Sequence, residues 1–280
     1  MARYTFSGHE SFSCKSLWLK KGYDFAKARN RFADDDAVVK LGVGKNMVSS
    51  IRYWLRAFGL TENDEVQPLA DFIFDDNQGV DPFMEETATL WLLHYSLVKK
   101  GTASIYRLGF MEFQREKKEF DKAAFHAFLK KKCSVPEQKN VYNENTVKKD
   151  INVFLQNYVQ ADDTKPSDDT TPLLQDLGLI FSTANDSYAF SETRPDMVPT
   201  AVMLYALKDY AGNETTLSFD VLKEVSLIFG LSASAMHEVL TKMANEYSKF
   251  VAYTDNSGIK NVQFLKPFNV AEILRSNYAL

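Results

Sequence analysis

Cysteine is scarce in this chain of 280 residues, which contains only Cys14 and Cys133. The two stand far apart and neither belongs to a Cys-x-x-Cys pair. This argues against a disulfide framework and against a structural zinc site. We expect both cysteines to be buried free thiols.

Long apolar runs are also lacking. No window approaches the roughly 18 consecutive apolar residues of a membrane-spanning helix, and the first residues lack the apolar core of a signal peptide. Because 45% of the residues are nevertheless hydrophobic, the chain has enough apolar side chains for two or three globular domains. We therefore expect a globular protein of the cytoplasm.

Nucleotide-binding and hydrolase motifs are absent as well. In the segment 42–46 the lysine is followed by Asn46, and the four residues that a Walker loop requires between its first glycine and Gly-Lys-Ser/Thr are missing. This excludes an NTPase site of that type. No Ser/His/Asp set can be recognised from residue order, because catalytic triads are defined by geometry.

The net charge of −4 hides blocks of opposite sign along the chain. Residues 15–56 hold ten Lys and Arg against four Asp and Glu, whereas residues 57–96 hold nine acidic residues and no Lys or Arg. Residues 97–132 are basic again, with ten against four. Such basic faces can bind phosphate, while the acidic segments repel a nucleic acid or meet a protein partner. The alternative is a set of solvated helices whose charges happen to cluster.

The most informative segment is 41–60, which predicts a tight glycine turn followed by a helix with two different faces. Apolar residues recur from Met47 onward with a period of 3.6 residues. This stripe consists of Met47, Ile51, Trp54, Leu55 and Phe58. The opposite face is polar and cationic, and Gly59 is placed to end the helix. That face carries Lys45, Ser49, Arg52 and Arg56.

An acidic start predicts a short helix over 34–41, so the two helices together have the outline of a helix-turn-helix unit. Such a unit presents its second helix to DNA. Gly42 and Gly44 would let backbone amides approach a phosphate at the partly positive helix N-terminus, where Lys45 adds a full charge. An ordinary amphipathic surface helix is the competing interpretation.

The same arrangement recurs in the middle of the chain. Residues 120–132 predict a helix with a basic end, and Asn143 is placed to cap a second helix over 144–159. The polar side of that second helix carries Asn145, Lys149, Asn152 and Gln156. After a polar loop over 160–171, a hairpin is expected around Asn185. Helix, helix, hairpin is the order of a winged helix.

The last third repeats this order. Helices are expected over 198–210, 218–229 and 232–247, and strands over 250–254 and 259–265, around a turn at 255–258. We therefore expect a mainly α protein with small β-hairpins (α+β), built from tandem helix-turn-helix and winged-helix-like units. The expected domains are an N-terminal helical domain over 1–100, a middle winged-helix-like domain over 101–195 and a C-terminal winged-helix domain over 196–280. Because the last helix shows no dense basic face, protein docking is the competing role for the third domain.

Two histidines are candidates for chemistry. His9 and Glu10 place an imidazole beside a carboxylate, a pair able to activate water or to hold a divalent ion if the acidic residues 34–36 fold close by. A capping or hydrogen-bonding role is the alternative. His94 lies in an apolar helix expected over 87–99, where an interior imidazole is favoured over a metal ligand. No residue is assigned as a metal ligand.

Three motifs carry a family resemblance: Phe6-Ser-Gly-His-Glu-Ser-Phe12, Trp18-Leu-Lys-Lys-Gly-Tyr-Asp-Phe25 and the segment 41–54. Together they resemble the N-terminal signature of a bacterial family known as a domain of unknown function, number four thousand and seven. Members of this family are similar to the DNA-nicking component of the Ssp phosphorothioate modification system, which replaces a non-bridging phosphate oxygen on one strand by sulfur. The resemblance covers residues 6–60 well and the whole chain loosely.

The resemblance implies a function, partners and site residues. It implies binding to double-stranded DNA and nicking of one strand. The cofactor stays unknown, with a divalent cation such as Mg²⁺ as the candidate, and no membrane partner is expected. The implied protein partners are a cysteine desulfurase, an ATP-pyrophosphatase-like sulfur transferase and an ATPase. The candidate DNA-binding residues are Lys20, Lys21, Gly42, Gly44, Lys45, Asn46, Ser49, Arg52, Arg56, Lys149 and Asn152. The candidate catalytic residues are His9 and Glu10.

Within this set, Arg52 and Arg56 are expected to reach base edges, and Lys45 with the two glycine amides to position the DNA backbone. Two alternatives stay open. One is a non-enzymatic adaptor that recognises DNA and recruits the sulfur-transfer machinery. The other is a winged-helix transcriptional regulator.

Overall fold

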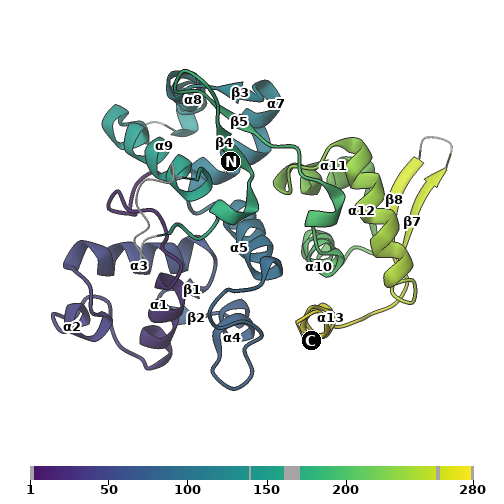
Figure 1. The fold of residues 1–280 in the computed structure, drawn as a ribbon, viewed down its shortest axis with the longest axis horizontal. Coiled ribbons are helices and arrows are strands. Elements are labelled where there is room, and N and C mark those ends of the chain that lie inside the picture. The colour runs from purple at the N-terminus through teal and green to yellow at the C-terminus, as the bar shows by residue number, and fades with distance from the viewer. Residues whose placement is uncertain (1–2, 139, 161–170, 257–258, 279–280) are drawn as a thin grey trace. The chain divides into compact units, whose positions relative to one another are not determined.

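The computed structural model describes residues 3–138, 140–160, 171–256 and 259–278. It divides the chain into two compact units, Met1–Ser191 and Glu192–Leu280. Both are mainly helical and contain small antiparallel sheets, which confirms the predicted class (Figure 1). The three-domain division with boundaries at 100 and 195 stays a prediction. No helix of the described ranges is long and apolar enough to cross a membrane.

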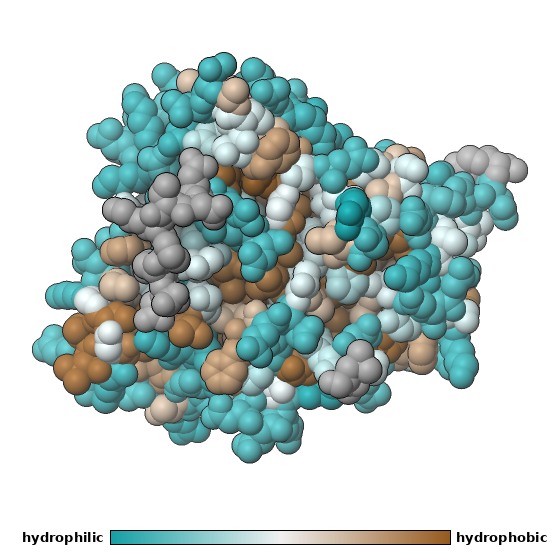
Figure 2. Space-filling model, viewed as in Figure 1, coloured by the Kyte–Doolittle hydropathy of each residue, from teal (hydrophilic) through white to brown (hydrophobic). Residues whose placement is uncertain are grey.

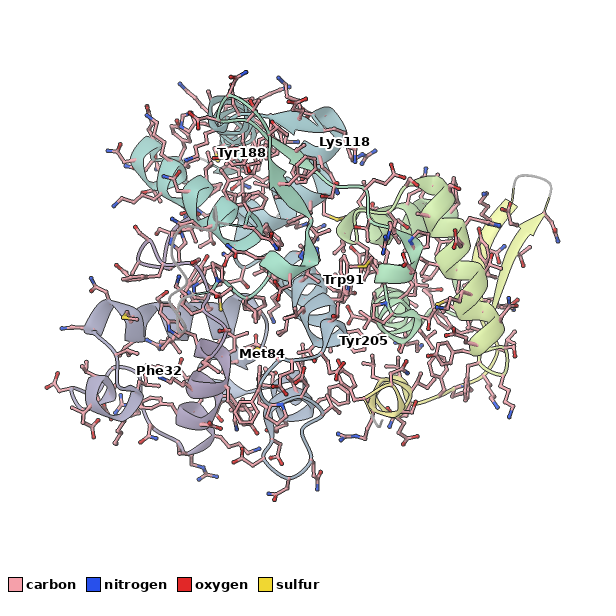
Figure 3. All side chains as sticks on the ribbon, viewed as in Figure 1. Phe32, Met84, Trp91, Lys118, Tyr188 and Tyr205 are labelled. Carbon is pink, nitrogen blue, oxygen red and sulfur yellow. The ribbon has the colours of Figure 1, made fainter. Side chains whose placement is uncertain are left out.

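The first unit begins with helices joined by short turns. Its elements up to residue 100 are α1 (Trp18–Lys27), α2 (Ala37–Leu41), α3 (Lys45–Ala57), β1 (Thr61–Glu62), β2 (Glu65–Val66), α4 (Pro68–Phe74) and α5 (Thr87–Lys100). Phe32, labelled in Figure 3, lies in the connection from α1 to α2. Its ring packs on the ring of Phe25 in α1, with 4.8 Å between the centroids. Hydrophobic residues gather at the surface over α2 (Figure 2), where Val39 is 81% exposed.

Helix α3 follows the predicted pattern. It begins after Gly44 and ends before Gly59, whose φ of 70° is the left-handed conformation expected of a glycine after a helix. The predicted stripe is buried apart from the half-buried Met47. Val48 and Tyr53 are buried in addition, and the N-terminal segment covers the side of Tyr53, where Gly8 packs on the ring.

The rest of the first unit shares its core with α5. The remaining elements are α6 (Ser104–Leu108), a π-helical turn η1 (Gly109–Phe113), α7 (Gln114–Glu116), β3 (Glu119–Phe120), α8 (Lys122–Lys132), η2 (Pro136–Gln138), α9 (Glu144–Tyr158), η3 (Gln175–Leu177), β4 (Ile180–Ser182) and β5 (Tyr188–Phe190). The ring of His94 in α5 contacts the Tyr158 hydroxyl of α9 at 2.7 Å and is fully buried. The prediction of an interior imidazole is confirmed. Residues from before and after position 100 thus fill one interior.

Local capping explains where α9 begins. The Asn143 side chain accepts a hydrogen bond from the Thr146 amide at 3.0 Å, as predicted for an N-cap. The predicted apolar stripe of α9 is buried, and its predicted polar side is exposed. Both cysteines are buried and free, which confirms that prediction.

A three-stranded antiparallel sheet in the order β3-β5-β4 completes the first unit. Strands β4 and β5 form the predicted hairpin, with Asn185 and Asp186 at positive φ in its turn. Strand β3 was not predicted, because two residues are too few for a periodic signal. Figure 3 labels Lys118, which directly precedes β3, and Tyr188, the first residue of β5. The Phe190 amide of β5 donates to the Lys118 carbonyl at 3.0 Å. Most of the predicted polar loop over 160–171 lies outside the described residues.

The second unit contains η4 (Pro195–Met197), α10 (Thr200–Ala211), β6 (Thr216–Ser218), α11 (Phe219–Ile228), α12 (Ala233–Glu246), β7 (Val251–Asn256), β8 (Ile259–Phe264) and α13 (Val270–Ser276). Its sheet is antiparallel in the order β6-β8-β7. The three predicted helices and two predicted strands are present, and Ser232 caps α12 by accepting from the Ala235 amide at 3.3 Å. Strand β6 and helix α13 were not predicted. Part of the predicted turn at 255–258 lies outside the described residues.

Candidate nucleic-acid interface

The outer face of α3 is exposed over its whole length. A Cβ atom added at Gly42 or Gly44 would meet nothing within 4 Å, so the turn before the helix is open. The exposed residues that follow this turn are Lys45, Asn46, Ser49, Arg52 and Arg56. The predicted cationic face therefore points to solvent.

The N-terminus of α3 has unused hydrogen-bond donors. Gly44 adopts an extended conformation, and its carbonyl accepts from the amides of Met47 and Val48 at 2.9 and 3.0 Å. No side chain caps this end, and no described residue accepts from the amides of Lys45 and Asn46. Two free amides at the positive end of a helix, with a lysine beside them, suit a phosphate oxygen.

Arg52 is engaged in an internal ion pair. Its Nε and Nη2 donate to the two carboxylate oxygens of Asp64, each at 2.7 Å. Asp64 lies in the β1–β2 turn beside Asn63, and both residues have positive φ. The two side chains are 50% and 34% exposed. A pair this accessible contributes about 0–1 kcal/mol, so a phosphate group can displace the Asp64 carboxylate from Arg52.

If the outer face of α3 binds DNA, replacing Asp64 by Asn should strengthen that binding about two- to fivefold, because the change releases Arg52 and removes a carboxylate next to the polyanion. The measurement is the dissociation constant for a short duplex by fluorescence anisotropy at fixed salt. Glu65→Gln is the matched control, since Glu65 is the next residue of the same hairpin and is also exposed. Equal effects of the two variants would contradict a specific release of Arg52.

Arg56 is the more available arginine. Its guanidinium lies 6.0 Å from the centroid of the Tyr53 ring, and it makes no ion pair with any residue in the described ranges. Gly8 packs on the same ring, since a Cβ there would come within 2.5 Å of Tyr53 Cδ2. The φ of Gly8 is 107°, which a residue with a side chain rarely adopts. Arg56 and Gly8 thus both pack against the Tyr53 ring.

The segment that contains Gly8, residues 7–11, is anchored to the protein interior by the side chain of His9, which is 4% exposed. The His9 Nε2 atom lies 2.8 Å from Asp150 Oδ1, and Nδ1 accepts from the Ser11 amide at 3.1 Å. The carboxylate also accepts from the Ser7 amide at 2.9 Å. Because a carboxylate only accepts and an amide only donates, this arrangement requires a neutral ring with its proton on Nε2. We call residues 7–11 the His9 loop.

The side chains of the predicted catalytic pair, His9 and Glu10, do not face the same site. His9 is buried with both ring nitrogens occupied, whereas Glu10 is exposed on the outside of the His9 loop, at a φ of 47°. The acidic residues 34–36 are exposed in the connection before α2. No group of three or more His, Cys, Asp or Glu able to hold a metal ion occurs among the described residues. A catalytic role for His9 and Glu10 stays a prediction.

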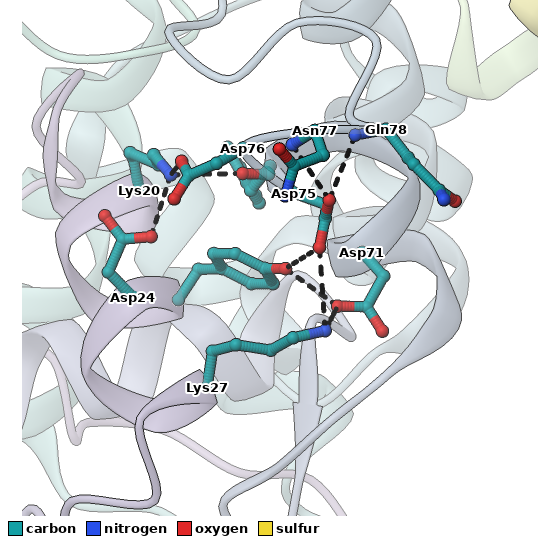
Figure 4. A network of polar contacts seen from close by, with 10 residues as sticks. Lys20, Asp24, Lys27, Asp71, Asp75, Asp76, Asn77 and Gln78 are labelled. Carbon is teal, nitrogen blue, oxygen red and sulfur yellow. Dashed lines mark hydrogen bonds and ion pairs between the residues drawn. The ribbon is translucent and has the colours of Figure 1, made fainter.

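The two predicted lysines of α1 have different surroundings. Lys20 is 8% exposed, and its ammonium donates to Asp24, Asp76 and the Phe74 carbonyl at 2.7, 2.5 and 3.1 Å (Figure 4). With these acceptors it joins α1 to the end of α4 rather than facing solvent. Lys21 is exposed.

The same network continues through Tyr23 and Lys27 (Figure 4). The Tyr23 hydroxyl donates to Asp71 at 2.8 Å, and burial together with this hydrogen bond raises the pKa of Tyr23. Lys27 pairs with Asp71 at 2.5 Å. The carboxylates of α4 and of the turn after it therefore neutralise Lys20 and Lys27 of α1.

Helix α9 borders the His9 loop on the other side. Lys149 and Asn152 are exposed, as predicted, while Asp150 between them is buried and bonded to His9. The sequence analysis missed Asp150, which has no local signal because its partner is 141 residues away. It also missed Asp64, although the Asn63-Asp64 pair is a hairpin signature that could have placed a carboxylate near α3.

These features define a helical protein with an exposed cationic helix face suited to a polyanion. The chain belongs to the family described as Protein of unknown function (DUF4007), which matches residues 6–278. It is similar to the crystal structure of magnesium ion-bound SspB, with 26% identity and a TM-score of 0.84 over 98% of this chain and 88% of that one. A second SspB crystal structure has 26% identity and a TM-score of 0.81 over 98% and 86%. No curated protein matches the chain.

Proposed function

We propose that this protein binds duplex DNA through the outer face of α3 and acts in a bacterial DNA phosphorothioate modification system, where it nicks one strand so that sulfur can be inserted. The similarity to SspB over 98% of the chain is the observation that carries this proposal. The resemblance of the N-terminal motifs to the same family supports it. The exposed cations of α3 supply a surface of the required charge.

In this proposal α2 and α3 act as a helix-turn-helix unit. The free amides of Lys45 and Asn46, together with the Lys45 ammonium, bind a backbone phosphate and set the register of the duplex. Arg56 extends toward base edges, and Arg52 joins it after leaving Asp64. Lys149 and Asn152 of α9 contact the DNA on the other side of the His9 loop.

The order of elements supports two further winged-helix-like units. In the first unit, β3, α8, α9, β4 and β5 follow one another as strand, helix, helix and hairpin, and their strands form one sheet. In the second unit, α10, β6, α11, α12, β7 and β8 give the winged-helix order in full, again with one sheet. In α12 the exposed His237 lies 3.1 Å from the Asp255 carboxylate of β7.

For strand cleavage, Glu10 offers a carboxylate on the exposed side of the His9 loop. Mg²⁺ is the candidate cofactor, since one of the two SspB structures contains it. The described residues do not form a magnesium centre of their own: Asp150 is 2% exposed, and its carboxylate is taken by His9 and Ser7. No catalytic step is therefore assigned to the metal. The proposed protein partners are a cysteine desulfurase, an ATP-pyrophosphatase-like sulfur transferase and an ATPase.

The burial of His9 favours a second candidate function. Because the imidazole expected to activate water is internal and bonded to Asp150, the protein also suits an adaptor role. An adaptor recognises DNA and recruits the sulfur-transfer components while another component cuts the strand. The two functions share the DNA interface and differ only in cleavage.

A plasmid assay separates them. If the protein is a nickase, it should convert supercoiled plasmid to the open circle, and Glu10→Gln should slow nicking by about 10²-fold or more, because a positioned acid or base contributes about that factor. The measurement is the rate of open-circle formation on agarose gels, with Mg²⁺ and with EDTA. Glu62→Gln, an exposed carboxylate in β1, is the control. DNA binding without nicking by the wild-type protein would establish the adaptor instead.

A further inference from the structure

A second group of cations lies in the first unit, outside the α3 interface. It consists of Arg107 in α6, Lys130, Lys131 and Lys132 at the end of α8, and Lys148 in α9. We call this group the α8 basic patch. All of its members are exposed apart from the half-buried Lys132. Arg107, Lys130 and Lys131 make no ion pair with a residue that the structure describes.

The N-terminal segment brings the parts of this patch together. The Tyr4 amide donates to the Gln138 side chain of η2 at 2.8 Å. The Thr5 amide donates to the Ser104 hydroxyl at 2.9 Å, and the Ser104 amide donates to the Thr5 carbonyl at 3.2 Å. Residues 4 and 5 therefore lie between η2, which follows α8, and the start of α6. Burial raises the pKa of the Tyr4 hydroxyl, and the nearby charges of Lys132 and Arg107 counteract part of that rise.

Acidic groups near the patch do not cancel its charge. Lys132 forms an ion pair with Glu112, and Lys148 pairs with Glu144 at 2.6 Å. Glu116 also acts on Lys132, so the five cations of the patch stand against the three carboxylates of Glu112, Glu116 and Glu144.

Aromatic rings flank the patch. The rings of Tyr4 and Tyr142 are half-buried, and the Tyr142 hydroxyl contacts His126 of α8 at 3.0 Å. Rings beside cations are typical of surfaces that bind single-stranded nucleic acids, whose bases stack on them. For a duplex, the exposed cations of the patch supply the phosphate contacts, as on the α3 face.

The patch lies close to the α3 interface. Four residues lead from Tyr4 to Gly8, which packs on the Tyr53 ring beside Arg56. A chain of this length spans at most about 14 Å. Because duplex DNA carries one charge per about 1.7 Å of its axis, about eight phosphate charges fit into that distance. A DNA backbone that is bound by Arg56 and follows residues 4–8 would therefore carry several phosphates along the stretch that leads to Tyr4, which lies near Lys132 and Arg107 of the α8 basic patch.

We propose that the α8 basic patch is a second binding site for the DNA backbone, continuous with the α3 interface, so that the bound strand crosses the His9 loop between two groups of cations. This inference rests on the proposed DNA-binding function and deepens it. With both groups of cations bound to DNA, the exposed Glu10 lies under the middle of the bound duplex rather than at one end of the contact. It also requires a duplex longer than the α3 contact alone.

The test compares the full chain with the variant Arg107→Ala/Lys130→Ala/Lys131→Ala. Its matched control is Lys117→Ala/Lys118→Ala/Lys122→Ala, which removes the same charge before and at the start of α8 from exposed lysines. Duplexes of about 8 and about 24 base pairs are titrated by fluorescence anisotropy over a series of salt concentrations, because phosphate contacts determine the salt dependence.

For the long duplex, the patch variant should bind roughly tenfold more weakly or worse, and the slope of log K against log salt should fall by about one for each phosphate that is no longer bound. For the short duplex, the patch variant should resemble the wild type, and the control variant should do so for both. Wild-type affinity and slope in the patch variant, or an equal reduction of affinity in the control, would overturn the inference while the α3 interface stands. A wild-type protein that binds neither duplex would instead refute the proposed function itself.

Discussion

Replacing Asp150 by alanine should destabilise the protein by about 3–5 kcal/mol. The carboxylate is 2% exposed, and it accepts from the His9 ring and the Ser7 amide at 2.8 and 2.9 Å. Alanine leaves both donors buried without an acceptor, and each such donor costs about 1–3 kcal/mol. The measurement is urea unfolding followed by circular dichroism, evaluated as the free energy of unfolding.

The neighbouring residue supplies the control. Lys149 lies in the same helix turn but is exposed, so Lys149→Ala should change the free energy of unfolding by no more than about 0.5 kcal/mol. Asp150→Asn keeps one acceptor oxygen and should lie between the two. If Asp150→Ala unfolds within about 1 kcal/mol of the wild type, the pair with His9 does not hold the His9 loop in place.

The Asp150 variant also bears on the candidate site, because the loop it supports carries Glu10. A loop with four residues at positive φ, Ser7, Gly8, Glu10 and Ser11, is conformationally costly and persists only when its surroundings determine it. Removing the acceptor of His9 should release the loop before it unfolds α9. Faster proteolysis within residues 7–11 in the Asp150 variant would show this local release.

Periodicity was sufficient to predict the helices that lie on one side of a core. In α3 the stripe of Ile51, Trp54 and Leu55 is buried as expected, and the left-handed Gly59 follows its end. The same holds for α9, where both the cap and the stripe were predicted. These are local signals, because the residues that specify each helix lie within it.

The hydrophobic period of the sequence did not predict all the buried residues where a helix packs against two neighbouring segments. Val48, Ser50 and Tyr53 lie outside the predicted stripe of α3, yet all three are buried. The Ser50 hydroxyl donates to the His9 carbonyl at 3.0 Å, so the His9 loop covers this side. Contact with a segment from the N-terminus of the chain produces no periodic pattern in the sequence of the helix that it covers. Sequence alone therefore predicted the cationic side of α3 but underestimated how much of the helix is covered.

Charge blocks counted along the sequence do not show which charges pair with one another. That the acidic stretch over 57–96 repels DNA or meets a partner stays a prediction, but several of its carboxylates form ion pairs with the preceding basic block. These pairs are Asp76 with Lys20, Asp71 and Asp75 with Lys27, and Asp64 with Arg52. A count of cations along the chain therefore overestimates those available to a ligand. On α3, Lys45 and Arg56 are the cations without an ion pair to a described residue.

Because Arg52 is paired with Asp64 and Arg56 has no such pair in the described part of the chain, the two arginines should contribute differently to DNA affinity. Arg56→Ala should weaken binding to a cognate duplex by about 1–3 kcal/mol, roughly 5- to 150-fold, if the guanidinium contacts a base edge. Arg52→Ala should cost less, because forming its DNA contact requires breaking the Asp64 pair. The double variant should exceed either single variant, and the two effects need not add, since the residues are one helix turn apart.

The measurement is an electrophoretic mobility shift at fixed salt, with several duplex sequences, for variants shown by circular dichroism to be folded. Arg29→Ala/Arg31→Ala is the charge-matched control, since both arginines are exposed in the connection from α1 to α2. A base contact predicts that Arg56→Ala narrows the differences in affinity among the sequences, whereas a phosphate contact weakens all of them equally. Unchanged affinity in the folded double variant would remove α3 from the interface. The proposed DNA-binding function would then require a different surface of the protein.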